Sequence, residues 1–212
     1  MTDTQPIRDI LDFWFLPLAD PGYGKPRELW WKSTPELDAE VAAKFGGLLE
    51  KAAAGALDSW AKSPDGALAL IVLCDQFSRN IHRRTARAFA TDAKALSTAR
   101  LALSRGYPAA YTTDMRVFFF MPFQHSEVLG DQQLCCDLFA TLGNENNDKY
   151  AVEHRDIVVR FGRFPHRNEA LDRPSTAEEL EYLKTADRLG NDRAVEVRRR
   201  RIEAAEDHAV ER

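Results

Sequence analysis

Apolar side chains recur at three- and four-residue spacing in nearly every segment between the Gly and Pro residues of the chain. This spacing places them on one face of an α-helix, and no convincing run alternates as a half-buried strand does. At Thr34 and at Ser63, a residue suited to the N-cap is followed by a proline suited to the first helical turn. The pattern therefore predicts an all-α fold.

Short turns containing Gly or Pro separate the predicted helices, which cover about residues 6–16, 34–54, 63–79, 86–105, 113–120, 124–142, 148–161 and 175–188. Either Ser175 with Glu178 or Thr176 with Glu179 forms a capping box at the start of the last helix. Helices paired in this way favour a tetratricopeptide-like or α-solenoid stack of antiparallel helices, although the sequence has no clean repeat of the tetratricopeptide length.

The composition changes the picture mainly at the C-terminal end. The chain has 212 residues, 44% of them hydrophobic, and can bury a substantial core. After Gly190, the basic run 198–201 stands among acidic residues with almost no large apolar side chain. We expect residues 1–190 to form one helical domain and residues 191–212 to form a charged helix or a disordered tail.

Net charge, the length of the apolar runs and cysteine usage argue against several classes of partner and compartment. The net charge of −4 gives no overall field that would attract nucleic acid or an anionic membrane. The longest apolar runs are far shorter than the roughly 20 residues that span a bilayer, and residues 1–10 do not resemble a signal peptide. The three cysteines include one adjacent pair and no Cys-x-x-Cys spacing, which favours a reducing compartment. We expect a soluble, cytoplasmic protein.

Residues 73–80 are the first of three segments that place polar groups against apolar faces. They follow residues 68–73, which are apolar on every side of their helix, as a buried helix is. Asp75 and Gln76 come one turn later and should also face protein. Arg79 stands four residues after Asp75, the spacing of an ion pair along one helix face, so this segment has a purely structural interpretation.

Residues 122–127 are the second segment. At helical spacing, Glu127 shares a face with Phe123, Leu134 and Leu138, so an acid is expected on an apolar stripe. His125 is two residues away, and within a regular helix the two side chains would diverge by about 200°. Both can reach one site only if His125 lies outside the regular part of the helix.

The third segment begins at His154, which shares an apolar seam with Ile157, and at such a position a buried structural histidine is more common than a functional one. It continues to residues 161–168, where cationic and amide side chains crowd a short connection. Such donors can hold a carboxylate or phosphate, or they can cap helix carbonyl groups.

Convergence of the three segments would satisfy all these polar groups at once, and a partly open cluster would be a binding site. The candidate ligand-binding residues are Asp75, Gln76, Arg79, Asn80, His125, Glu127, His154, Arg163, His166, Arg167 and Asn168.

The strings Asp-Gln-Phe-Ser-Arg-Asn, His-Ser-Glu and Phe-Gly-Arg-Phe-Pro-His-Arg-Asn occur in this order, with His154 between the last two. In these motifs the chain resembles the family called domain of unknown function 924, over about residues 7–189. The resemblance implies a tetratricopeptide-like fold and, because the family has no established activity, no catalytic residue. Two positions depart from the family pattern: Cys74 replaces an aliphatic residue, and Asp172 replaces a glycine before Arg173.

Two functional hypotheses remain open. One is a binding protein or enzyme for a small anionic molecule, with arginines as clamps, His125, His154 or His166 as proton carriers, and Asp75 or Glu127 orienting them. The other is a non-enzymatic scaffold that holds a peptide or a partner protein, with the polar cluster structural.

The sequence predicts no cofactor and no metal site. It has no Glu-x-x-His or His-x-x-x-His pair, and several arginines would repel a cation. It also lacks the motifs of P-loop, dinucleotide and hydrolase sites. The reaction, the ligand and any homo-oligomeric state stay open.

Overall fold

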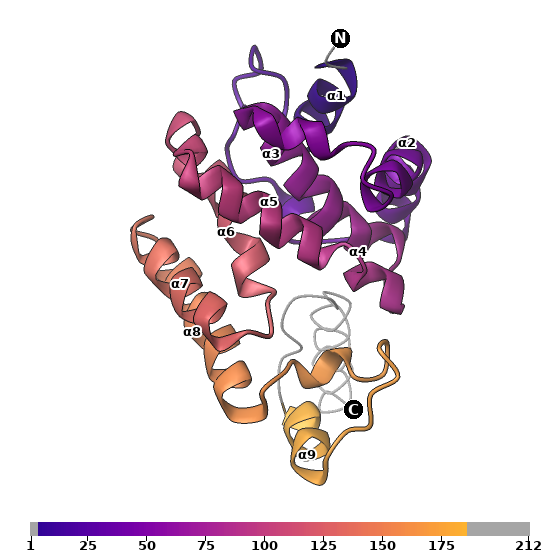
Figure 1. The fold of residues 1–212 in the computed structure, drawn as a ribbon, viewed down its shortest axis with the longest axis vertical. Helices are drawn as coiled ribbons and strands as arrows, with labels where there is room; N and C mark the ends of the chain where they lie inside the picture. The colour runs from indigo at the N-terminus through magenta and orange to yellow at the C-terminus, as the bar shows by residue number, and fades with distance from the viewer. Residues whose placement is uncertain (1–3, 186–212) are drawn as a thin grey trace, which may run out of the picture.

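A computed structural model describes residues 4–185, which contain helices and no β-strand (Figure 1). The all-α prediction is confirmed, and the packed helices agree with a helical stack. The tetratricopeptide likeness and the division at residue 190 stay predictions, and residues 191–212 lie outside the described part of the chain. The α-helices are α1 (Thr4–Phe15), α2 (Pro35–Ala53), α3 (Pro64–Ile71), α4 (Ser78–Ile81), α5 (Asp92–Ser104), α6 (Thr113–Gln124), α7 (Leu129–Ala140), α8 (Glu145–Phe161) and α9 (Ala177–Thr185).

The predicted helix starts are visible in their caps. The Ser63 hydroxyl accepts a hydrogen bond from the Gly66 N–H at 3.2 Å, and Thr34 does the same for Leu37. At α9, Glu179 Oε2 accepts from the Thr176 N–H at 2.7 Å, while Thr176 Oγ1 accepts from the Glu179 N–H at 3.2 Å. The second of the two predicted capping boxes is therefore the one that forms.

A π-helical turn, η3 (Val72–Phe77), joins α3 to α4 in one continuous buried rod. Two hydroxyl groups donate to the carbonyl of Cys74 inside this turn: Ser78 Oγ at 2.7 Å and Thr91 Oγ1 at 2.6 Å. These hydroxyl groups supply hydrogen bonds to a backbone carbonyl at the point where the regular α-helical hydrogen-bond pattern is interrupted. The turn carries both Asp75 and Gln76 and sets the direction in which they point.

Aromatic side chains dominate the core between α1, α3 and α6. Phe118 lies edge-on to Trp14 and Trp30, with ring centroids 6.0 and 5.0 Å away. Trp30 is buried, and its indole N–H donates to the Trp14 carbonyl at 2.7 Å. The neighbouring Trp31 is 39% exposed.

The second half of the structure turns away from this core. α7 packs on α6 and on α8, and the chain then leads through the short helix η6 (Pro165–Arg167) to α9 (Figure 1). A smaller apolar cluster of Ile157, Val158 and Phe164 lies at this end. None of the described helices is long and apolar enough to cross a membrane.

Two predicted helix ends were wrong. α6 does not stop at Phe120 but continues through Pro122 to Gln124. A proline inside a helix costs about 3 kcal/mol, but burying each phenylalanine of this helix contributes about 2 kcal/mol, so continuation is favoured. The Ala-rich segment 86–105 is split into η4 (Ala86–Phe89) and α5, and the Thr91 hydroxyl between them turns to the Cys74 carbonyl.

Residues 125–128 form a turn, so α7 begins at Leu129 rather than at Gln124. The fully buried Gln132 amide holds this turn, because its Nε2 donates to the carbonyls of Gln124 at 2.8 Å and Ser126 at 2.5 Å. Glu127 consequently lies in the turn and not on an apolar stripe with Phe123, Leu134 and Leu138, as the helical spacing had predicted.

Candidate functional site

Asp75 and His125 meet between the π-helical turn and the C-terminal end of α6. Nδ1 of His125 lies 2.7 Å from Asp75 Oδ1, and the Gln76 side-chain amide donates to Asp75 Oδ2 at 2.5 Å. All three side chains are buried. His125 can turn toward Asp75 because it is the C-cap residue of α6 and lies outside the regular helix.

Arg79 lies between two carboxylates. Its Nη1 is 3.2 Å from Asp75 Oδ1, as the spacing of the two residues had predicted, and it donates to the Asp75 backbone carbonyl at 2.5 Å. Nη1 and Nη2 also donate to Asp92 Oδ1 and Oδ2 at 2.9 and 3.0 Å. The two-pronged pair with Asp92 uses most of the hydrogen-bonding capacity of Arg79.

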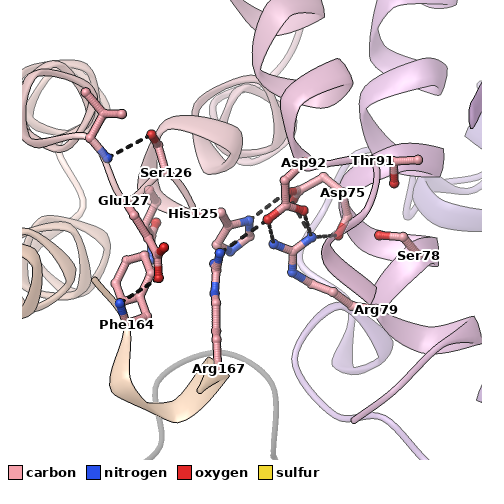
Figure 2. Close-up of polar contacts among 12 residues, drawn as sticks. Asp75, Ser78, Arg79, Thr91, Asp92, His125, Ser126, Glu127, Phe164 and Arg167 are labelled. Carbon is pink, nitrogen blue, oxygen red and sulfur yellow. Dashed lines mark hydrogen bonds and ion pairs between the residues drawn. The ribbon is translucent and has the colours of Figure 1, made fainter. Parts of the chain in front are cut away.

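Asp92 is a member of the site that the sequence did not indicate. It is the first residue of α5, where an acid is ordinarily explained by the positive end of the helix. Its side chain also accepts from Arg167 Nη1, with Oδ2 3.3 Å away. Figure 2 shows the five side chains of this central cluster directed toward one another: Asp75, Arg79, Asp92, His125 and Arg167.

Arg167, at the end of η6, is buried to an unusual degree for an arginine, with a side chain only 7% exposed. Its guanidinium carbon lies 4.7 Å from the ring centroid of Phe89 and 4.7 Å from that of Phe164. Burial and the neighbouring Arg79 lower the pKa of Arg167 to about 10, so it stays cationic at neutral pH. Its Nε is buried and has no hydrogen-bond partner.

The Asp75–His125 pair holds a carboxylate against a neutral imidazole. Burial opposes ionisation of Asp75, but His125 and Arg79 outweigh it and keep the pKa of Asp75 below its ordinary value. Burial lowers the pKa of His125 as well, although Asp75 opposes that shift. With Nδ1–H donated to Asp75, Nε2 of a neutral His125 keeps its lone pair, the form needed to accept a proton.

The other two candidate histidines differ from His125. Nδ1 of His154, on α8, lies 2.7 Å from the Tyr150 carbonyl, to which it can donate. The Gln124 amide nitrogen lies 3.1 Å from Nδ1 and 3.4 Å from Nε2 of the same ring. Burial lowers the pKa of His154 to about 3, and burial together with Arg167 does the same for His166. Both are neutral, and neither has a carboxylate partner among the described residues.

Glu127 belongs to a neighbouring network that fixes the loop before η6. Its Oε1 accepts from the Phe164 N–H at 2.8 Å, and its two oxygens pair with Arg173 Nη1 and Nη2 at 2.7 and 3.0 Å. Arg173 in turn donates to the Phe164 carbonyl at 3.1 Å. Both backbone polar groups of Phe164 are therefore held, which positions its ring against Arg167.

Arg163 and Asn168 complete this Glu127 network. Arg163 makes a two-pronged pair with Glu179 at 2.6 and 2.8 Å. Asn168 accepts from Arg173 Nε at 3.1 Å and donates to Glu179 Oε2 at 3.3 Å. Asp172, at the position where the family pattern has a glycine, adopts a positive φ of 52°, and aspartate tolerates this left-handed conformation better than most residues.

Asn80 stands apart from both groups. Its side-chain amide donates to Asp38 Oδ1 at 2.7 Å and to Ser33 Oγ at 3.3 Å, which ties α4 to α2. The sequence therefore grouped residues that the structure divides. The central group contains Asp75, Gln76, Arg79, His125 and Arg167. The adjoining network contains Glu127, Arg163 and Asn168, and Asn80 belongs to neither. Within residues 4–185, no group of three or more His, Cys, Asp or Glu side chains is arranged to hold a metal ion.

Comparisons with known proteins agree with the motifs. The model of the family described as "Bacterial protein of unknown function (DUF924)" matches residues 10–187. A solved structure of a protein of unknown function from Agrobacterium tumefaciens is similar, with 40% sequence identity and a TM-score of 0.77, over 86% of this chain and 99% of that one. No curated protein matches. The chain belongs to the DUF924 family.

Proposed function

We propose that this protein binds a small anionic molecule through Arg167, in the cluster that also contains His125 (Figure 2). The observation that supports the proposal is the unpartnered Nε of a guanidinium that is more than nine-tenths buried. A buried donor without an acceptor costs about 1–3 kcal/mol, and more when the group is charged. A bound anion would offset that cost.

The geometry of the guanidinium indicates how the anion would bind. Arg167 contacts Asp92 through Nη1, whereas Nε and Nη2 have no hydrogen bond to the residues that the structure describes. In an arginine side chain, these two nitrogens form the lateral edge, whose parallel N–H bonds match the two oxygens of a carboxylate or phosphate. The unused edge is thus the one suited to a two-pronged anion contact.

The surroundings favour a small ligand bound at this edge. The rings of Phe89 and Phe164 cover Arg167, so a contact there is shielded from water and strengthened. Arg79 is already paired with Asp75 and Asp92, which leaves Arg167 as the cation of the central cluster with unused hydrogen-bond donors.

We propose a cytoplasmic location for this activity on the cysteine usage alone.

Thermal denaturation against small carboxylates, phosphate monoesters and short peptides tests the proposal. A ligand at a hundredfold excess over its Kd stabilises the folded state by about 2.7 kcal/mol. For a domain of this size, that raises the unfolding midpoint by about 8 °C. In Arg167→Lys, which keeps the charge but loses the lateral edge, we expect the ligand-induced rise to disappear.

Arg163→Lys is the matched control. Its guanidinium lies in the same connection but is already held by Glu179 and the Pro174 carbonyl. This variant should unfold at a lower temperature and still respond to the ligand. If no carboxylate or phosphate raises the midpoint of the wild type, the proposal fails; a response to peptides alone would support the scaffold hypothesis instead.

A further inference from the structure

The charges of the central cluster already cancel before any ligand binds. Asp75 and Asp92 carry two negative charges, and Arg79 and Arg167 carry two positive ones. Glu127 is neutralised by Arg173 in the adjoining network. An anion on Arg167 would therefore give a buried excess of negative charge, which is strongly unfavourable unless a further charge compensates it.

His125 is the group that can supply this compensation. It contacts Asp75 of the π-helical turn and interacts with the charges of Arg79 in α4 and Asp92 in α5. His154 of α8 and His166 of η6 also lie near it, and Arg167 of η6 belongs to the same cluster (Figure 2). Nδ1 of His125 lies against the Asp75 carboxylate, and Nε2 has no hydrogen bond to the described residues. A proton on Nε2 would give an imidazolium that Asp75 already stabilises.

The other histidines are poorly suited to this role. His154 has both ring nitrogens within reach of fixed neighbours, the Tyr150 carbonyl and the Gln124 amide. His166 lies next to Arg167 and packs its ring on Phe164, with centroids 5.5 Å apart. A proton on His166 would place two cations side by side without a carboxylate between them.

We infer that the site takes up a monocarboxylate together with one proton, the carboxylate on the lateral edge of Arg167 and the proton on Nε2 of His125. This inference rests on the proposed anion site. One proton balances one negative charge, whereas a phosphate dianion would leave a second charge uncompensated beside Asp75 and Asp92. The proton comes from an acid in the solvent, whose bond to it breaks as the Nε2–H bond forms, and no other covalent bond changes.

The test uses the full chain with acetate and inorganic phosphate as probes, between about pH 6 and pH 8. We expect the acetate affinity to fall by about tenfold for each unit of pH above the pKa of His125 in the free protein, because one proton enters with each acetate. Calorimetry in buffers with different heats of ionisation should report one proton taken up per acetate. At the upper end of this range, where inorganic phosphate is mostly the dianion, phosphate should bind more weakly than acetate.

Variants and a spectroscopic measurement show which histidine takes up the proton. In His125→Asn, whose amide can still donate to Asp75, acetate binding should lose its pH dependence, while His166→Asn should keep it. Nitrogen-15 chemical shifts of the histidine rings in the wild type should show acetate-induced protonation of His125, which covers the case of a variant that does not fold.

The outcomes separate the two proposals. If acetate binding depends on Arg167 but takes up no proton, this inference is wrong and the proposed anion site is unaffected. The same holds if His125→Asn still takes up a proton with acetate. Tighter binding of phosphate than of acetate at about pH 8, where phosphate is mostly the dianion, overturns the monocarboxylate class. Failure of both probes to bind the wild type counts against the anion site itself.

Discussion

Replacing Asp92 with asparagine tests whether one carboxylate holds the central cluster together. Asp92 accepts three charge-assisted hydrogen bonds, two from Arg79 and one from Arg167. Its side chain is 22% exposed, whereas the two arginines are 9% and 7% exposed, so the cations have little access to water when their partner is neutralised.

The expected loss follows from that burial. Breaking a buried ion pair by removing one partner costs about 3–5 kcal/mol. Because Asp92 is partly exposed and asparagine retains one acceptor oxygen, we expect Asp92→Asn to lower the free energy of unfolding by about 3 kcal/mol. This corresponds to a fall of about 9 °C in the unfolding midpoint for a domain of this size. Urea denaturation followed by circular dichroism measures the free energy directly.

Asp58→Asn is a suitable control, because its pair with Lys94 leaves Asp58 61% exposed. Surface pairs of this kind contribute little, so a change within about 0.5 kcal/mol is expected. A loss below about 1 kcal/mol for Asp92→Asn would refute the view that Asp92 organises the two arginines. The same variant carries one negative charge less, so any acetate binding should proceed without a proton on His125.

Three further predictions concern the surrounding structure. Glu127→Gln keeps an acceptor for the Phe164 N–H but loses the charge opposite Arg173, and should cost about 1 kcal/mol in urea denaturation. Gln132→Ala removes the amide that holds the 125–128 turn and should cost about 2–3 kcal/mol in the same measurement. Since the pKa values of His154 and His166 are lowered to about 3, the unfolded chain binds more protons. The free energy of unfolding, and with it thermal stability, should therefore fall as pH drops from about 6.5 toward 3, by about 1.4 kcal/mol per pH unit for each histidine. His154→Gln should weaken this dependence.

Local features of the structure were predicted well from the sequence, because each depends on residues that are close together in the chain. The caps at Ser63 and Thr176 depend on residues three positions away, and the Asp75–Arg79 pair depends on the geometry of one helical turn. That the Asp75 and His125 segments would meet was inferred because neither had enough polar partners nearby in the sequence, and the structure brings these side chains together.

The features that sequence reasoning missed depend on distant contacts. The π-helical turn coincides with hydroxyl groups of Ser78 and Thr91 at one carbonyl, and Thr91 comes from beyond the next loop. Glu127 was placed on an apolar face because the helical pattern gave no sign that Gln132 would hold a turn there. Asp92 gave no signal because an acid at the start of a helix already has a local explanation.

The polar segments of this chain differ most clearly in whether their hydrogen-bonding capacity is used. In the Glu127 network, Glu127 and Glu179 each face an arginine with two-pronged geometry, and Asn168 is held by Arg173 of the same loop and by Glu179 of α9. Such a network accounts for its own burial and requires no ligand. Arg167 is different, because aromatic rings enclose it while its lateral edge lacks an acceptor. A fold that keeps a buried cation incompletely paired forgoes stability at that position, and we propose anion binding as the function that compensates for it.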